Sequence, residues 1–279
     1  MDINNLIEMA IAEDIGSGDY TSLSCIPANA TGKAQLLVKE KGILAGMEVA
    51  KMVFQRIDES LVFNSILKDG DQITPGDIAF TIEGSNQSIL KAERIVLNFM
   101  QRMSGIATKT KHYTELIKGY NTKVLDTRKT TPGLRLVEKL AVKIGGGQNH
   151  RMGLYDMIMI KDNHIDYAGG IAAAINKTNA YLKENNLDLK IEIEARNLKE
   201  LDEILVVGNV DIIMLDNFSF EDMRTAVKKI NGKYKTEASG GITETTIRDY
   251  AACGVDFISV GALTHQINSL DLSLKAVEK

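Results

Sequence analysis

The chain has 279 residues, of which 44% are hydrophobic and 25% are charged, the proportions of an ordinary globular protein. Its net charge of −4 gives no sign of nucleic-acid binding, so any anion site must be local. Apolar runs such as Met157–Ile160 are far too short to cross a bilayer, which argues against a membrane protein. Only two cysteines are present, and residues 1–18 lack the early basic region of a secretory signal. These features predict a cytoplasmic protein.

Up to about residue 105, the pattern is that of a small α/β domain. Lys33–Lys39 and Asp77–Ile82 are expected to be strands, and the second alternates apolar and smaller residues as a half-buried strand does. Glycine and aspartate turns separate these segments. A long helix is expected from about Lys91, because apolar residues recur there at helical spacing while Arg94 and Arg102 lie on another face.

After residue 120, short apolar strands alternate with amphipathic helices. Strands are expected at Lys123–Asp126, Met157–Ile160, Lys190–Ala195, Asp211–Leu215, Thr236–Ala238 and Phe257–Val260. Helices are expected at Leu134–Val142, Gly170–Lys183, Leu198–Val206, Phe220–Ile230 and Glu244–Cys253. This order predicts a parallel sheet covered by helices. Six strands are fewer than the eight of a complete α/β barrel, so an incomplete barrel, a barrel with disguised strands and a doubly wound open sheet remain alternatives.

Unusual polar residues follow all six expected strands. They are Asp126–Lys129, Lys161–His164, Glu194, Asp216–Asn217, Ser239–Gly241 and Gly261. Helix capping explains one or two such residues, but six in succession with varied chemistry are hard to obtain from capping alone. Ligands of parallel α/β folds bind outside the carboxyl ends of the strands. The sequence therefore predicts an active site at this edge.

Cations are concentrated between Lys123 and His164. Those next to turns or a strand end are Arg128, Lys129, His150, Arg151 and Lys161. Arginine offers a planar fork for carboxylate or phosphate and lysine a compact charge, so this group suits a polyanionic small molecule. A second group, consisting of Arg135, Lys139 and Lys143, falls on an expected helix, where we predict an ordinary solvated face.

Acidic residues are expected on the same edge. Glu192 and Glu194 alternate with isoleucine, so both side chains should point to one face of their strand. A buried carboxylate must be paired, protonated or bound to a metal, and Lys161 is a possible partner. Asp216 is a second acid at this rim. The pair suits Mg²⁺, ribose hydroxyls or a developing positive charge, and the spacing does not choose among them.

Two glycine-containing loops predict a phosphate site. Ser239–Thr243 and Val260–Thr264 each place glycine between a strand and a helix start, where backbone N–H groups can approach an anion. A third segment, Gly145–Gly147, cannot be helical and is expected to form a loop that presents His150 and Arg151.

At these residues the sequence resembles the quinolinate phosphoribosyltransferase family, also called nicotinate-nucleotide pyrophosphorylase (carboxylating). The resemblance is carried by Leu125–Gly133, Gly145–Arg151 and Ile160–His164, and continues through Glu194, Leu215–Phe218, Glu237–Ile242, Glu93–Arg94, Ser104–Ala107, Glu13–Asp14 and Gly18–Asp19. It implies transfer of phosphoribosyl from phosphoribosyl pyrophosphate to quinolinate with decarboxylation. The products would be nicotinate mononucleotide, pyrophosphate and CO₂, in NAD biosynthesis, with Mg²⁺ required.

The resemblance also implies a fold and roles for the site residues. Residues 1–105 would form an N-terminal α/β sandwich domain, with 265–279 packing back on it, and residues 106–264 an incomplete α/β barrel. Catalysis falls to Lys129, Glu194 and Asp216, and the two acids would also hold Mg²⁺. Substrate contacts would come from Thr127, Arg128, Lys129, His150, Arg151, Lys161, Ser239, Gly240, Gly241 and Gly261. Arg94 would be supplied by the neighbouring subunit of a homodimer.

Three other functions deserve a test. A related phosphoribosyltransferase would act on nicotinate or another ring without decarboxylation. A non-catalytic phosphate sensor could share the fold, although loss of function should erode the charged residues, and here the set is complete. An aldolase-like barrel would use Lys161 to form a Schiff base.

Overall fold

The computed structural model describes residues 2–277, which divide into two compact units. Unit 1 comprises the described parts of 1–111, 129–146 and 262–279, and unit 2 comprises 112–128 and 147–261. The expected domain boundaries, 1–105 and 106–264, stay a prediction. Within the described residues, no helix is both long and apolar enough to span a membrane.

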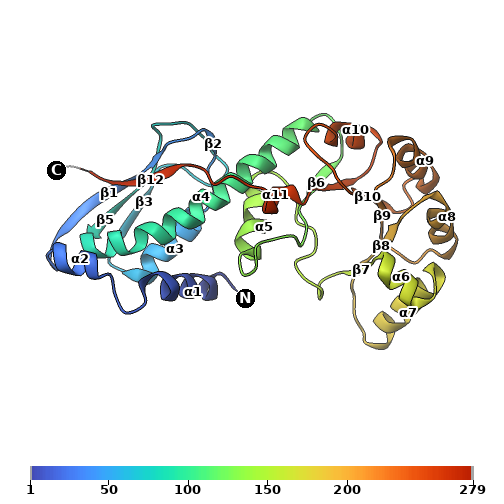
Figure 1. Ribbon diagram of the computed structural model, residues 1–279, viewed down its shortest axis with the longest axis horizontal. Coiled ribbons are helices and arrows are strands. Elements are labelled where there is room, and N and C mark those ends of the chain that lie inside the picture. The colour runs from blue at the N-terminus through green and yellow to red at the C-terminus, as the bar shows by residue number, and fades with distance from the viewer. Residues whose placement is uncertain (1, 278–279) are drawn as a thin grey trace. The chain divides into compact units, whose positions relative to one another are not determined.

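Unit 1 is built on a four-stranded antiparallel sheet in the order β12-β1-β5-β3 (Figure 1). The strands are β1 (Thr31–Val38), β3 (Val62–Ser65), β5 (Ile78–Ser85) and β12 (Leu272–Ala276). The last strand pairs with β1, so residues near the C-terminus belong to the same sheet as residues near the N-terminus. Two short strands, β2 (Gly42–Ile43) and β4 (Gln72–Ile73), pair separately.

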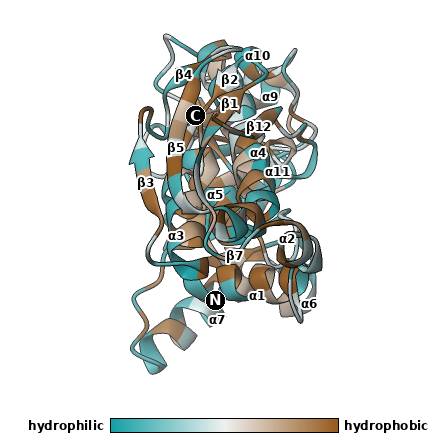
Figure 2. Ribbon diagram, turned by 90° about the vertical axis from the view of Figure 1, so that its left-hand side faces the viewer, coloured by the Kyte–Doolittle hydropathy of each residue, from teal (hydrophilic) through white to brown (hydrophobic). Residues whose placement is uncertain are grey.

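The helices of unit 1 supply the other half of its core. They are α1 (Ile3–Ile15), α2 (Tyr20–Cys25), α3 (Met47–Ile57), α4 (Asn86–Leu116, whose last turn is assigned to unit 2), α5 (Arg135–Ile144) and α11 (Ala262–His265). Helices α1 and α3 carry both hydrophobic and hydrophilic residues (Figure 2), as amphipathic helices do. Phe54 of α3 lies edge-on against Phe80 of β5, and both are fully buried.

Helix α4 begins at Asn86, earlier than the expected start near Lys91. The side chain of Ser85 accepts a hydrogen bond from Ser88 N, which satisfies one of the free N–H groups at the helix start. The apolar stripe that predicted the helix begins later than this cap. The pattern of apolar residues therefore located the helix but placed its start too late.

Unit 2 contains the six expected parallel strands. They are β6 (Lys123–Leu125), β7 (Ile158–Ile160), β8 (Ile191–Ala195), β9 (Ile212–Asp216), β10 (Lys235–Ser239) and β11 (Phe257–Ser259). The order is β6-β11-β10-β9-β8-β7. From β7 to β11, each strand therefore lies next to the strand that precedes it in the chain, always on the same side. A doubly wound sheet would reverse direction at a switch point, and this sheet does not. The expected incomplete α/β barrel is confirmed, because β6 and β7 are edges rather than neighbours.

The helices of unit 2 cover one side of this arc of strands (Figure 1). They are α6 (Asp162–Ala168), α7 (Ile171–Glu184), α8 (Leu198–Val207), α9 (Phe220–Ile230) and α10 (Ile247–Ala252). The other face collects the polar side chains of the strands. Glu194 is in register with Met214, and Met214 with Glu237, so alternate residues of β8, β9 and β10 share this inner face.

Candidate active site

The carboxyl edge of β8 and β9 holds the two predicted acids, Glu194 and Asp216. Glu194 is 8% exposed and forms an ion pair with Lys161, whose Nζ lies 3.7 Å from Glu194 Oε2. The N–H of Asp162 also donates to Oε2, at 3.3 Å. Burial raises the pKa of Glu194, Lys161 lowers it, and the charge of Asp216 raises it. The predicted ion pair with Lys161 is therefore present, and Asp216 is close enough to act on the charge of Glu194.

The loops after β9 and β10 fit closely together. Asn217 has a left-handed backbone (φ +56°), its N–H donates to Ser239 O at 2.9 Å, and its Nδ2 donates to Asp216 Oδ2 at 2.7 Å. Gly240 has φ +102°, and a Cβ there would lie only 3.0 Å from Asn217 N and overlap its amide oxygen. Glycine is needed at 240 because Asn217, which orients Asp216, occupies that space.

Asp126 anchors the loop that carries His150 and Arg151. It is fully buried at the end of β6, and its carboxylate accepts from His150 N at 2.9 Å and from Asn149 Nδ2 at 2.5 Å. Gln148 also pairs with Leu125 as an isolated parallel bridge. Charge-assisted hydrogen bonds of this kind are the stronger ones, so the loop is held firmly against β6.

Arg128 and Arg151 form the basic part of the site in unit 2. The guanidinium of Arg151 donates to Met157 O at 3.3 Å and contacts Met159 Sδ at 3.5 Å. Burial lowers the pKa of Arg151, and so does the charge of Arg128, whereas Glu192 and Asp156 raise it. Because the positive charge of Arg128 acts on Arg151, an anion bound beside them would be stabilised by both.

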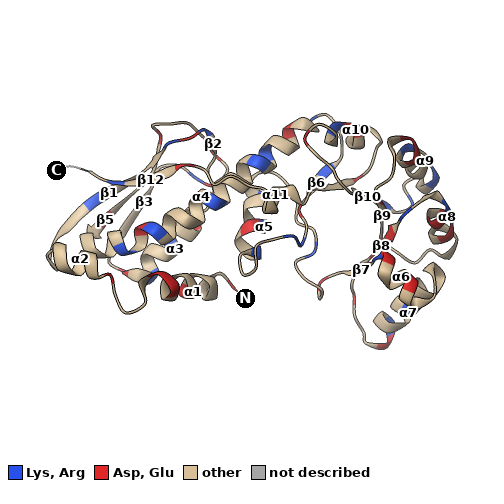
Figure 3. Cartoon of the chain, viewed as in Figure 1, with Lys and Arg blue, Asp and Glu red and all other residues tan. Residues whose placement is uncertain are grey.

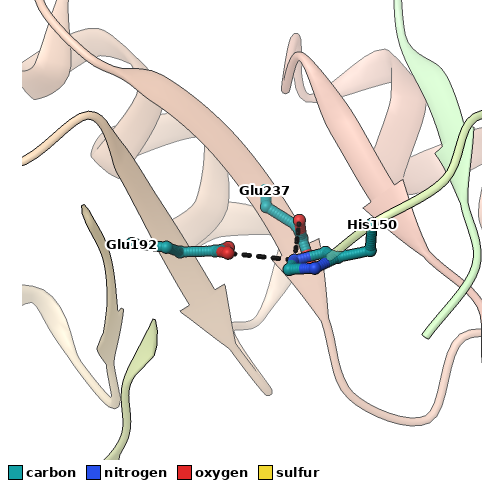
Figure 4. A group of neighbouring side chains, drawn as sticks. All are labelled: His150, Glu192 and Glu237. Carbon is teal, nitrogen blue, oxygen red and sulfur yellow. Dashed lines mark ion pairs between the residues drawn. The ribbon is translucent and has the colours of Figure 1, made fainter. Parts of the chain in front are cut away.

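The carboxylates of Glu192 of β8 and Glu237 of β10 both approach one nitrogen of the His150 ring, Nε2 (Figure 4). His150 Nε2 is 2.9 Å from Glu192 Oε2 and 3.4 Å from Glu237 Oε2, and both carboxylates are fully buried. Burial and the charge of Glu237 raise the pKa of Glu192 to about 7. This group, which we call the inner cluster, is the only set of three histidine, cysteine or acidic residues among those described that could surround a metal ion.

Two influences on the charge of His150 oppose each other. Burial lowers its pKa, but the two carboxylates outweigh burial and raise it. On the other side of the ring, however, Nδ1 accepts the N–H of Arg151 at 2.7 Å. This contact is decisive, because an N···N distance of 2.7 Å accommodates one hydrogen and not two. We therefore assign the neutral ring with its hydrogen on Nε2.

Unit 1 holds the predicted residues Lys129 and Arg94. Lys129 is exposed, and its carbonyl accepts from Thr264 Oγ1 at 2.8 Å. The next turn is held by Arg102 of α4, whose Nη2 donates to Thr131 Oγ1 at 2.6 Å and contacts the buried Glu138 of α5 at 2.5 Å. A cavity of about 480 Å³ is lined by Arg102, Lys129, Thr130, Thr131, Thr264, His265 and Ile267. Arg94 is exposed on α4.

The prediction that Arg135, Lys139 and Lys143 form a solvated face of α5 is wrong for one of the three residues. Lys143 is exposed and Arg135 is half-buried, but Lys139 is only 1% exposed. Lys139 follows Val137 and Glu138, which are buried as well, so α5 is enclosed on more than one side. Figure 3 shows acidic colouring on α5 and basic colouring along α4. Sequence spacing indicated only one apolar face and could not reveal that enclosure.

The remaining predicted residues lie at strand ends of unit 2. Thr127 follows the buried Asp126, Ser239 ends β10, Gly241 has a left-handed backbone (φ +57°), and Gly261 follows β11. Sequence reasoning noted Asp126, Glu192 and Glu237 but gave none of them a role in the site. The alternation of Glu192 with Glu194 was a usable signal, whereas nothing local indicated that Glu237 would meet His150.

The fold and this edge of the sheet define an α/β enzyme suited to a polyanionic substrate. Two family models match the chain: quinolinate phosphoribosyl transferase, C-terminal domain, over residues 106–275, and the N-terminal domain of the same family over residues 19–104. The chain therefore belongs to the quinolinate phosphoribosyl transferase family.

Individual relatives agree with this assignment. A chloroplastic nicotinate-nucleotide pyrophosphorylase (carboxylating) of Arabidopsis thaliana is 46% identical, over 98% of this chain and 82% of the relative. A probable enzyme of the same name from Synechocystis is 41% identical, over 99% and 92%. The crystal structure of NadC from Streptococcus pyogenes superposes with a TM-score of 0.93 at 42% identity, covering 99% of this chain and 97% of that one. Human nicotinic acid phosphoribosyltransferase, at 12% identity and a TM-score of 0.66, shares the fold alone.

Proposed function

We propose that this protein transfers the phosphoribosyl group of phosphoribosyl pyrophosphate to quinolinate and decarboxylates the product to nicotinate mononucleotide, in NAD biosynthesis. One observation carries the proposal. In a chain of this family, paired arginines and paired carboxylates stand on the edge of one parallel sheet. Quinolinate is a dicarboxylate and the other substrate is more highly charged, so binding both requires this surplus of cations.

The basic residues divide according to the geometry of their charges. Arg128 and Arg151 offer planar forks that match the two carboxylates of quinolinate, with His150 beside them. Lys161 and Lys129 supply compact charges for phosphate. Thr127, Ser239, Gly240, Gly241 and Gly261 are proposed to bind phosphate or ribose through hydroxyl and backbone N–H groups.

Transfer breaks the bond between the anomeric carbon and the pyrophosphate oxygen, and the electron pair leaves with pyrophosphate. Positive charge develops on the ribose, where the carboxylates of Glu194 and Asp216 can stabilise it. The ring nitrogen of quinolinate then bonds to the anomeric carbon and becomes cationic. When the neighbouring carboxylate leaves as CO₂, the electron pair of the broken C–C bond stays on the ring beside this cation, and that carbon takes a proton from water. No protein nucleophile is required.

Glu194 and Asp216 also suit Mg²⁺, which commonly keeps several waters and takes one or two carboxylates together with substrate phosphates. The fit rests on two carboxylates that share one sheet face on neighbouring strands, with the charge of Asp216 acting on Glu194. When bound, Mg²⁺ would neutralise charge on the departing pyrophosphate. We also propose a homodimer in which Arg94 serves the neighbouring subunit, and a cytoplasmic location.

The decisive assay supplies quinolinate, phosphoribosyl pyrophosphate and Mg²⁺ and measures CO₂ and nicotinate mononucleotide. Turnover of quinolinate but not of nicotinate supports the proposal, and the reverse identifies the non-decarboxylating alternative. Lys129→Ala and Glu194→Ala should abolish turnover while the fold is kept, with Lys228→Ala on the exposed side of α9 as the control. Unchanged turnover in both site variants would refute the assignment. A borohydride-trapped adduct on Lys161 would instead favour an aldolase-like reaction.

A further inference from the structure

We propose that Glu192 and Glu237 are positioning residues, which hold the ring of His150 and through it the substrate-binding Arg151. The proposal rests on the proposed function, since it assumes that Arg151 binds the substrate dianion. Neither glutamate is needed for the chemistry described above. Their burial is costly, because each places a carboxylate in the protein interior, and the partner that the structure gives both of them is the ring of His150.

The ring of His150 is held at both nitrogens. Nε2 faces Glu192 and Glu237 (Figure 4), and on the other side of the ring Nδ1 accepts the N–H of Arg151. The backbone N–H of His150 is held in turn by Asp126. These contacts fix His150 and the main chain that follows it, so the stem of the Arg151 side chain starts from one defined position. Two strands, β8 and β10, thereby control the orientation of a residue on a loop.

The same contacts argue against a metal ion in the inner cluster. A metal bound at Nε2 would require the ring hydrogen to be on Nδ1. Nδ1 already faces the N–H of Arg151, so a hydrogen there would meet another hydrogen. Nε2 lies 2.9 and 3.4 Å from the two carboxylates, which is ion-pair distance, although neither contact has the direction of a hydrogen bond from the ring. Glu192 and Glu237 thus act on His150 as negatively charged groups packed against Nε2.

The first experiment reads the ring directly and does not depend on turnover. The chain has only four histidines, so protein labelled with ¹⁵N-histidine gives a simple spectrum, and His150→Gln assigns the signal of His150. We expect hydrogen on Nε2 alone at neutral pH. Hydrogen on Nδ1, or on both nitrogens, would overturn the proposal, as would a divalent metal found in stoichiometric amount in the purified protein and absent from Glu192→Gln.

The second experiment measures kinetics in a double-mutant cycle. Glu192→Leu removes the nearer carboxylate and should raise KM for quinolinate about tenfold, because His150 and the main chain at Arg151 are then held less firmly. Glu192→Gln keeps the shape of the side chain and a polar oxygen next to Nε2, so it should recover most of that loss. KM for phosphoribosyl pyrophosphate should change much less, because the inner cluster acts on the cations assigned to quinolinate.

The cycle is completed by Arg151→Lys, alone and combined with Glu192→Leu. If Glu192 acts through Arg151, the second change should add little to KM for quinolinate once the first is made. The positioning role would be refuted if the effects of the two substitutions on KM for quinolinate were fully additive. It would also be refuted if KM for quinolinate and KM for phosphoribosyl pyrophosphate rose equally, since Glu192 would then have only a structural role. Absence of any quinolinate turnover in the unmodified enzyme would refute the proposed function instead, while the histidine spectrum would still test the inner cluster. If Glu192→Leu fails to fold, the histidine spectrum of the unmodified protein still tests the proposal, because it shows which nitrogen of His150 carries the hydrogen.

Discussion

Replacing Gly240 by alanine tests whether the loops after β9 and β10 depend on each other. Alanine at φ +102° is strained by about 1–3 kcal/mol. The new Cβ would also lie 2.5 Å from Asn217 Cγ and force that side chain away. The hydrogen bond from Asn217 to Asp216 would then be lost, at about 1 kcal/mol. Strain and the lost hydrogen bond together should lower the free energy of unfolding by about 2–4 kcal/mol.

Gly241→Ala is the matched control for stability. Its backbone is also left-handed (φ +57°), but a Cβ there meets nothing within 4 Å. Strain alone should cost about 1–2 kcal/mol. Gly240→Ala should therefore lower stability by about 1–2 kcal/mol more than Gly241→Ala, a further fall in Tm of roughly 2–8 °C.

Thermal unfolding followed by circular dichroism measures the difference, and steady-state kinetics shows whether Asp216 has moved. We expect kcat of Gly240→Ala to fall about tenfold or more, since Asp216 loses the amide that orients it. Equal Tm values for the two variants would refute the steric argument. A normal kcat in a destabilised Gly240→Ala would show that the position of Asp216 does not depend on Asn217.

Three further predictions concern other parts of the chain. Glu138→Gln should destabilise the protein by about 3 kcal/mol in chemical unfolding, because it leaves the partly buried Arg102 without a charged partner, and an unchanged midpoint would contradict this. Chelation of divalent metal should abolish turnover, with recovery on adding Mg²⁺, and full activity in chelator would exclude the proposed metal role. Burial raises the pKa of the Cys253 thiol, so less of it is thiolate at a given pH. Iodoacetamide at pH 8 should therefore modify the exposed Cys25 before Cys253, as followed by mass spectrometry, and equal rates of modification would contradict the burial of Cys253.

The sequence indicated much of the site because its signals are local. Glu192 and Glu194 fall on one sheet face by simple alternation, and the pairing of Lys161 with Glu194 was among the foreseen outcomes. The burial of Lys139 could not be predicted from neighbouring residues. Its position on a helix with charged neighbours suggested solvent, but burial depends on how many elements surround the helix.

The sequence by itself therefore determined the six strands of unit 2 and the charged residues at their ends. Both depend on the pattern of apolar and polar residues within short stretches of the chain. Tertiary structure decided which distant residues meet. His150, Glu192 and Glu237 are separated by more than forty residues at each step, and only the strand order β10-β9-β8 together with the anchoring of the His150 loop by Asp126 brings them to one point. The same holds for Gly240, whose necessity depends on Asn217 from another loop. Such contacts follow from the packing of strands, which no single stretch of sequence specifies.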